Sequence, residues 1–144
     1  QMLGAWVHDP DGHDGDPGST RGLGLLEVET RMVPDKRLTR VQGRALGQPV
    51  EGYEIHMGRA QGPDCARPLA HIPEPEGATS ADGRVTGTHL HGLFAGDAFR
   101  AAWLARLGAP STPGYGAGVE AVLDRLAAHL ETHLDLDRLF ALAG

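Results

Sequence analysis

Histidines are the residues of this sequence whose types and spacing most readily suggest chemistry. His89 and His91 lie two residues apart in a predicted strand, residues 84–91, so both side chains are expected on one face of a sheet. Gly92 follows and ends that strand. In open α/β sheets ligands bind outside the carboxyl ends of the strands, and an imidazole there can act as a general base near neutral pH. The end of this strand is therefore a candidate site.

A third histidine, His56, lies on another predicted strand, residues 53–57, just before Gly58 and near Arg59. Three interpretations are open for these imidazoles. They can be hydrogen-bonded structural residues, one of them can be a general base, or all three can bind zinc, which takes three or four N, S or O ligands. No Cys pair or His-Glu motif accompanies them to favour zinc.

The single cysteine, Cys65, lies in a loop, residues 61–68, without the strand–turn–helix frame that exposes a nucleophile at a helix N-terminus. A thiolate there lacks the positive helix end that lowers a thiol pKa. We therefore interpret Cys65 as a bystander. One cysteine also rules out an internal disulfide framework, which fits a reducing cytosol and predicts a cytoplasmic protein.

The elements that must position these residues follow from hydrophobic periodicity. Alternation and turn signals predict strands at residues 24–30, 37–43, 53–57, 69–72 and 84–91. Apolar residues at helical spacing predict helices over residues 97–107 and 119–130. The order of strands and helices fits an α/β layer fold.

The first residues of the chain also have helical spacing, with Met2, Leu3, Trp6 and Val7 on one side. This predicts an amphipathic helix over residues 1–7. Because no N-cap precedes it, we expect the chain to be part of a longer one. Residues 9–20 are rich in Gly, Pro and Asp, and are expected to form a solvated loop rather than a calcium site, since their spacing misses the calcium-loop pattern.

Composition limits the partners. The 144 residues carry a net charge of −6 at pH 7, which argues against nucleic acid, because phosphate binding needs a clustered positive surface. No run of about 18 apolar residues is present, so no membrane-spanning segment is expected.

Four segments read together resemble the glutaminase domain of cobyric acid synthases, a branch of the triad glutamine amidotransferases. They are Gln-Met-Leu-Gly from Gln1, Gly-Leu-Gly-Leu-Leu-Glu-Val-Glu-Thr from Gly22, Gly-Tyr-Glu-Ile-His-Met-Gly-Arg from Gly52, and Gly-Thr-His-Leu-His-Gly-Leu-Phe from Gly87. Their order and spacing match the family. The resemblance implies a partial flavodoxin-like fold, with a mostly mixed sheet and flanking helices, and makes residues 1–144 the C-terminal portion of the domain.

The resemblance also implies roles for single residues. His91 matches the catalytic base, which takes the proton of a cysteine thiol and returns it to the leaving ammonia. That cysteine would stand four positions before Gln1, outside the sequence, so His91 is expected to face the same place as Gln1. Gln1 resembles a glutamine-binding residue, Arg59 one that holds the substrate's α-carboxylate, and His56 and Tyr53 would line the same pocket.

For the whole enzyme, the resemblance implies a glutamine-hydrolysing amidoligase of cobalamin biosynthesis. Ammonia from glutamine would be passed to an ATP-using domain and then to side-chain carboxylates of a corrinoid, adenosylcobyrinic acid a,c-diamide. ATP and magnesium would be bound in that other domain, because no phosphate-cradling loop occurs here, and no cofactor is expected in residues 1–144. Without the thiol, this chain is expected to be inactive alone.

One departure and three alternatives remain. Many triad amidotransferases have Pro-Glu after the base, whereas Gly92 and Leu93 follow His91, so the third triad member is not identified. The chain could instead resemble a cobyrinic acid a,c-diamide synthase or the glutaminase subunit that amidates lipid II. It could also be a non-catalytic zinc-binding module. A partial sheet would expose edges and apolar surface, so self-association is expected.

Overall fold

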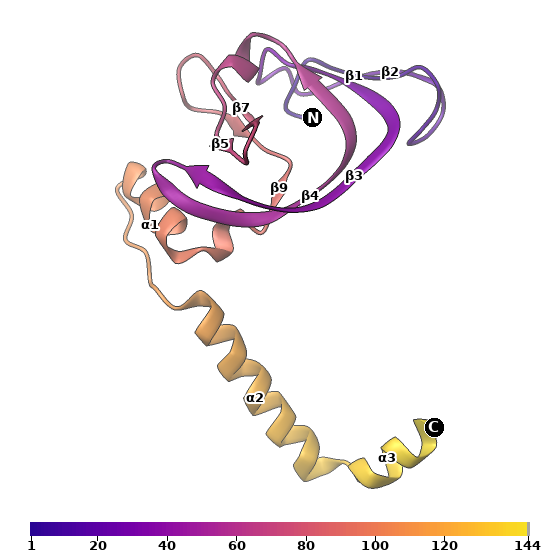
Figure 1. Ribbon diagram of the computed structural model, residues 1–144, viewed down its shortest axis with the longest axis vertical. Helices are drawn as coiled ribbons and strands as arrows, with labels where there is room; N and C mark the ends of the chain where they lie inside the picture. Colours follow the sequence, from indigo (N-terminus) through magenta and orange to yellow (C-terminus); the bar gives the residue numbers. More distant parts are fainter. Residues whose placement is uncertain (144) are drawn as a thin grey trace.

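The computed structural model describes residues 1–143 and is built on one mixed sheet with a small two-stranded sheet beside it (Figure 1). The path through the main sheet is β2-β1-β3-β4-β9, and β5 pairs with both β3 and β6. These strands are β1 (Trp6–Asp9), β2 (Gly18–Arg21), β3 (Glu29–Ala45), β4 (Gln48–Gln61), β5 (Ala70–His71), β6 (Pro75–Glu76) and β9 (Leu90–His91). The β1–β3 pair is parallel and the other pairs are antiparallel. The predicted α/β class and mixed sheet are confirmed.

A long, curved β3–β4 hairpin is the frame of the molecule, as Figure 1 shows. Leu46 and Gly47 form its tip, both with positive φ (51° and 75°), as a two-residue type I′ connection requires. The ladder is interrupted between Met32 and Arg37, where residues 33–36 of β3 stand opposite the single residue Met57 of β4. These four residues are called the excursion of β3 below. They include Pro34, which could not donate a ladder hydrogen bond.

Two apolar clusters close over this frame. The larger lies between the tip of the hairpin, β5, β9 and α1 (Asp97–Arg106), and Phe99 of α1 is fully buried in it. The Phe99 ring meets the Phe94 ring at a centroid distance of 5.3 Å in an edge-to-face arrangement. The smaller cluster unites Leu26, Val28 and Ala78. The predicted helix over residues 97–107 is thus confirmed, and it is held by an aromatic anchor.

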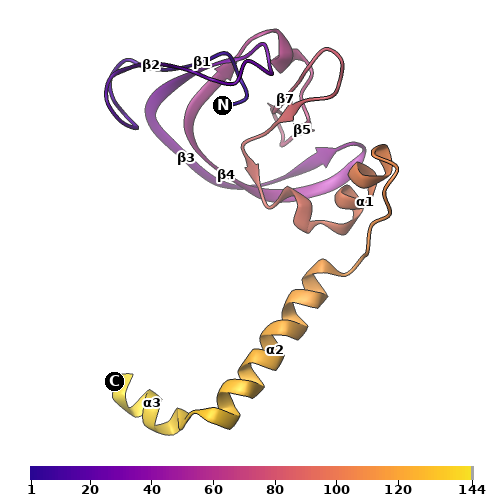
Figure 2. The ribbon, with the colours of Figure 1, turned by 180° about the vertical axis from the view of Figure 1, so that it is seen from behind.

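Two further helices leave this body. No side chain of α2 (Tyr115–His133) or α3 (Leu136–Ala143) is buried, and both views show α2 projecting away from the sheet (Figures 1 and 2). The first turn of α2 is tied to α1, because the Tyr115 N–H donates to Asp97 Oδ1 (3.3 Å) and the Arg100 guanidinium lies over the Tyr115 ring. The predicted helix over residues 119–130 is confirmed, and α3 was not predicted. None of the helices in residues 1–143 is both long and apolar enough to cross a bilayer.

Several predicted elements are wrong. Residues 1–5 form turns and Trp6–Asp9 is strand β1, so no helix spans residues 1–7. Seven residues of apolar spacing are too few to distinguish a helix from an edge strand that finds a partner, and here β1 pairs with β3. The region of residues 24–30 becomes strand only from Glu29, and the region of residues 84–91 is divided. β8 (Thr86–Gly87) pairs with β7 (Ala78–Thr79), whereas β9 pairs with β4.

The expected loop of residues 9–20 is partly regular. β2 pairs back on β1, with Asp9 opposite Gly18, so residues 10–17 are the tip of a hairpin. The Asp9 carboxylate accepts the N–H groups of His13 (2.8 Å) and Asp14 (2.9 Å), which lowers the Asp9 pKa. The Asp9 carboxylate therefore shapes the turn.

Candidate active site

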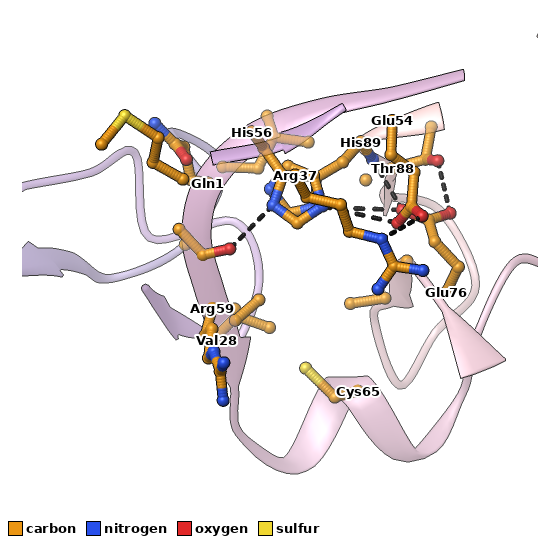
Figure 3. A pocket seen from close by; sticks show the side chains of 18 of the residues that line it. Gln1, Val28, Arg37, Glu54, His56, Arg59, Cys65, Glu76, Thr88 and His89 are labelled. Carbon is orange, nitrogen blue, oxygen red and sulfur yellow. Dashed lines mark hydrogen bonds and ion pairs between the residues drawn. The ribbon is translucent and has the colours of Figure 1, made fainter. Parts of the chain in front are cut away.

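A pocket of about 650 Å³ lies on the concave side of the β3–β4 hairpin (Figure 3). Its wall is formed by residues from β3, its excursion and β4, and the opposite side by the first residues of the chain and the segments around β7 and β8. Its polar lining residues include Gln1, Arg37, Glu54, His56, Arg59, Glu76, Thr88 and His89. Segments distant in sequence thus place several titratable side chains around one space.

Glu54 is a buried carboxylate at the centre of this group. It projects from β4 with a side-chain exposure of 6%, and its Oε2 lies 2.7 Å from Nε of Arg37. The contact is an ion pair rather than a well-aligned hydrogen bond, since Oε2 has no hydrogen-bond partner. Oε1 lies 3.4 Å from Nε2 of His56, two residues further on the same face of β4. Glu54 therefore lies between Arg37 of β3 and His56 of β4.

The imidazoles of His56 and His89 stack on one another, with a centroid distance of 4.4 Å. Nδ1 of His56 lies 2.8 Å from the carbonyl oxygen of Gly58, so Nδ1 carries the proton, because a carbonyl only accepts. This hydrogen bond turns Nε2 of His56 towards Glu54. The Nδ1 hydrogen bond orients the His56 ring, and Nε2 can donate to Glu54 only when the ring is doubly protonated.

His89 is held uncharged. Burial, and the positive charge that His56 can carry, lower the pKa of His89 from 6.5 to about 4. Its Nε2 atom is buried and has no hydrogen-bond partner among residues 1–143. A neutral imidazole with one free ring nitrogen can accept or donate a hydrogen bond, so His89 is equipped to bind a polar group in the pocket.

Glu76 anchors the strand end on which His89 lies. Oε2 of Glu76 accepts the Thr88 hydroxyl (2.6 Å), and Oε1 accepts the His89 backbone N–H (2.7 Å). The Thr88 oxygen in turn accepts the Leu90 N–H at 3.0 Å. One carboxylate, itself buried, thereby orders the residues that lead into β9.

The predicted substrate-binding residues are only partly brought together. Gln1, His56 and Arg59 line the pocket, whereas Tyr53 does not. The predicted base, His91, also lies outside it: His91 stands opposite Tyr53 in the β4–β9 ladder, and their rings stack at 5.5 Å. Consecutive residues of a strand project to opposite faces, so Tyr53 and His91 share the face opposite to Glu54.

Two geometric expectations are therefore wrong. His91 does not face the same place as Gln1, and His89 and His91 do not share a face, because strand β9 begins only at Leu90 and His89 precedes it. Glu54 and Glu76 were not recognised from the sequence. Glu54 had a signal, since it lies two residues before His56 on a strand; Glu76 had none, because its partners are twelve and thirteen residues away.

A zinc site built from the three histidines is not supported. Although His56 and His89 are in contact, His91 is on the other face, and residues 1–143 contain no group of three or more His, Cys, Asp or Glu side chains placed to hold a metal ion.

Cys65 lies at the floor of the pocket, on a short 3-10 helix, Pro63–Ala66 (Figure 3). Burial and the neighbouring Asp64 raise the pKa of its thiol. The thiolate is the nucleophilic form of cysteine, so this environment opposes reactivity, in agreement with the bystander interpretation.

Comparison with known proteins identifies the family. The profile of the CobB/CobQ-like glutamine amidotransferase domain matches residues 1–99. The chain belongs to this family. The matched range contains all residues that line the pocket, which extend from Gln1 to His89.

Individual relatives point to one branch of the family. The chain is 77% identical over 143 residues to a cobyric acid synthase of Paracoccus denitrificans and 61% identical over 147 residues to one of Cereibacter sphaeroides. A cobyric acid synthase of Hyphomonas neptunium is 59% identical over 149 residues. These matches cover 99%, 99% and 100% of this chain but only 30%, 31% and 30% of the relatives. The chain thus spans about a third of the length of these curated proteins.

Proposed function

We propose that this chain is the glutamine-binding part of a cobyric acid synthase-like enzyme, a glutamine-hydrolysing amidoligase of cobalamin biosynthesis. The observation that supports this most directly is the family match over residues 1–99, which encloses the whole polar pocket. Similarity to cobyric acid synthases over nearly the whole chain supports this branch rather than a diamide synthase or a lipid II amidating subunit.

In this proposal the pocket binds glutamine. Arg59 would hold the α-carboxylate, for which a guanidinium offers paired donors, and Gln1 and His56 would contact the rest of the substrate. The His56 ring is oriented by its hydrogen bond to the Gly58 carbonyl oxygen. Tyr53 would act indirectly, by stacking on His91.

The nucleophile is proposed to be a cysteine outside residues 1–144, four positions before Gln1. Its thiolate would attack the side-chain carboxamide carbon, and the tetrahedral intermediate would expel ammonia, which takes up a proton from the imidazolium. Water would then hydrolyse the thioester to glutamate. We assign the base to His91 on family resemblance; four extended residues can span about 13 Å, so the position of Gln1 does not dictate that of the thiol.

The rest of the enzyme would use the ammonia. ATP and magnesium would be bound outside this chain and would activate corrinoid carboxylates as acyl phosphates, which the ammonia converts to amides. Two features of the sequence fit this division: its net charge is negative, and it contains no phosphate-binding loop. Residues 1–144 need no cofactor of their own in this scheme.

The test is glutamine hydrolysis by the full-length protein, followed as glutamate release. His91→Asn is expected to lower kcat by about 10²–10⁴-fold, the usual contribution of a general base. His89→Asn tests whether His89 rather than His91 is the base. A larger loss of kcat in His89→Asn than in His91→Asn would assign the base to His89. Cys65→Ser is expected to stay within about threefold of the wild type, since Cys65 has no chemical role in the scheme.

The 144-residue chain alone provides the complementary measurement. It is expected to release no ammonia from glutamine, because it lacks the proposed thiol. Turnover by the chain alone that is abolished in Cys65→Ser would contradict the proposal and make Cys65 the nucleophile.

A further inference from the structure

The linkage between Glu76 and the residues before His91 has no role in the scheme above, although it is the most fully bonded polar contact of the pocket. We infer that Glu76 is a positioning residue, whose carboxylate holds the strand end that carries His89 and His91 in its working place. This inference rests on the proposed glutaminase function, and it concerns a carboxylate whose two oxygens both accept hydrogen bonds from the chain itself.

The first support is that the backbone pairing between β7 and β8 does not extend to Glu76. β7 and β8 pair Thr79 with Thr86 and Ala78 with Gly87, and the ladder stops there. Gly77 has φ 80°, and a Cβ on it would lie 2.6 Å from the Gly87 carbonyl oxygen. The chain therefore turns away at Gly77. Beyond this point the connection between the two segments passes to the Glu76 side chain.

The second support is the geometry of the carboxylate. Its two oxygens take one donor each, the Thr88 hydroxyl at 2.6 Å and the His89 N–H at 2.7 Å, both short, as hydrogen bonds to a charged acceptor are. The Thr88 oxygen also accepts the Leu90 N–H, so the constraint reaches the residue next to His91.

The third support is that Glu76 is itself firmly placed. Its residue exposure is 7%, and it pairs with Ala70 of β5 in the β5–β6 ladder. Its carbonyl oxygen accepts the Leu69 N–H at 2.9 Å. β5 also pairs with β3, so Glu76 transmits the position of the main sheet to the segment before β9. Without the carboxylate, that segment loses these hydrogen bonds and keeps the two-residue β9 pairing with β4, the packing of Leu90 and the stacking of His89 on His56.

The test uses the full-length protein. Glu76→Gln keeps the size of the side chain, but one of its two terminal atoms becomes a donor that cannot accept the Thr88 hydroxyl or the His89 N–H. We expect kcat for glutamine hydrolysis to fall about 10–100-fold with KM within about threefold, because a catalytic group displaced by about 1 Å costs up to about 10²-fold in rate. Glu74→Gln is the matched control, an exposed carboxyl on the same loop that is expected to leave kcat unchanged.

A second pair of variants guards against misfolding of Glu76→Gln. Thr88→Val removes only the bridging hydroxyl and is expected to lower kcat in the same direction, whereas Thr88→Ser retains the hydroxyl and is expected to restore the rate relative to Thr88→Val. Hydrogen exchange provides a readout independent of turnover: the amides of His89 and Leu90 should exchange faster in Glu76→Gln than in Glu74→Gln.

The outcomes separate the inference from the function on which it rests. If the wild type hydrolyses glutamine and Glu76→Gln keeps its kcat, the positioning role is wrong and the glutaminase function stands. The positioning role would also be overturned if kcat of Glu76→Gln fell only in proportion to the amount of soluble folded protein while amide exchange stayed unchanged. If the wild type does not hydrolyse glutamine, the proposed function fails, and faster exchange at His89 and Leu90 would leave Glu76 only a structural clamp.

Discussion

At the scale of residues, each buried carboxylate of the pocket has a charged or hydrogen-bonding neighbour, whereas one imidazole nitrogen has none. Glu54 is paired with Arg37 and faces His56, and Glu76 is bonded by Thr88 and His89. The ring of His89 receives no such support, because Nδ1 is 3.8 Å from Glu76 Oε1 and Nε2 has no partner. Burying an imidazolium there would cost free energy, which is why the ring stays neutral.

This has a consequence for the pH dependence of stability. The pKa of His89 is about 4 in the folded chain against 6.5 in an unfolded reference, so between these values the unfolded state binds more protons. Folding free energy is therefore lost as the pH falls from 6.5 to 4, by up to about 3 kcal/mol for this group. Well above pH 6.5 the ring is neutral in both states and contributes nothing to the slope.

The measurement is urea unfolding of the 144-residue chain and of His89→Asn at about pH 7 and about pH 4.5. The variant is expected to lose less stability on acidification than the wild type. Equal losses in the two proteins, or an NMR titration that shows His89 protonating near pH 6.5, would contradict the assignment.

At the scale of elements, the close approach of β4 and β9 depends on Gly52. A Cβ at this position would lie 2.1 Å from the His91 carbonyl oxygen and 2.9 Å from Cδ1 of Leu90. Backbone cannot yield as a flexible side chain can, so Gly52→Ala is expected to separate β9 from β4 and to destabilise the chain by about 1–3 kcal/mol. Urea unfolding and exchange of the β9 amides measure the two effects.

Gly116→Ala is the matched control. Gly116 lies in α2, where a Cβ would meet open space, so the same substitution is expected to be neutral or to stabilise the helix by up to about 1 kcal/mol. A similar loss in both variants would show that the effect of Gly52→Ala does not come from the contact with His91.

The strands also show how much of the fold can be predicted from the sequence. Residues 37–43 and 53–57 were predicted as strands from their alternation, and they lie within β3 and β4. The burial does not follow the apolar pattern, because Leu38, Tyr53 and Ile55 are exposed whereas Glu54 is buried. The full lengths of β3 and β4 were not predictable, because Glu29 and Gln61 are held by pairing rather than by pattern. Nor could the sequence show that His89 precedes strand β9. Because β9 begins after His89, it is His89 and not His91 that faces the pocket.

The candidate site follows the same rule. Gln1, His56 and Arg59 were predicted from motifs, and all three line the pocket. The role of Glu76 depends on a turn at Gly77 and on contacts across twelve residues, which no local pattern encodes.

At the scale of the whole molecule, the exposed apolar face of the C-terminal helices is the dominant surface feature. Val122, Leu123 and Leu126 of α2 are each more than half exposed, and Phe140 and Leu142 of α3 are 68% and 77% exposed. Exposed apolar side chains at helical spacing along α2 favour association, because apolar surface of this kind is rarely left in contact with water. We predict that the 144-residue chain self-associates.

Sedimentation velocity over a range of concentrations tests this. Leu123→Glu combined with Leu126→Glu is expected to shift the distribution towards monomer, because both residues lie on the apolar face. The matched control is Ala121→Glu combined with Ala128→Glu, which adds the same charge on the other side of the helix. A wild-type chain that remains monomeric at high concentration, or an equal response of both double variants, would contradict the prediction.

The excursion of β3 at residues 33–36 separates two regular stretches of ladder, and Val33, Asp35 and Lys36 within it line the pocket. A segment that is out of register with its partner can gain or lose residues without disturbing the hairpin on either side. Evolution could thus deepen or narrow the cavity here by insertion or deletion alone. Among related enzymes, variation in length at this point would be a means of adjusting which substrate is accommodated while the scaffold stays constant.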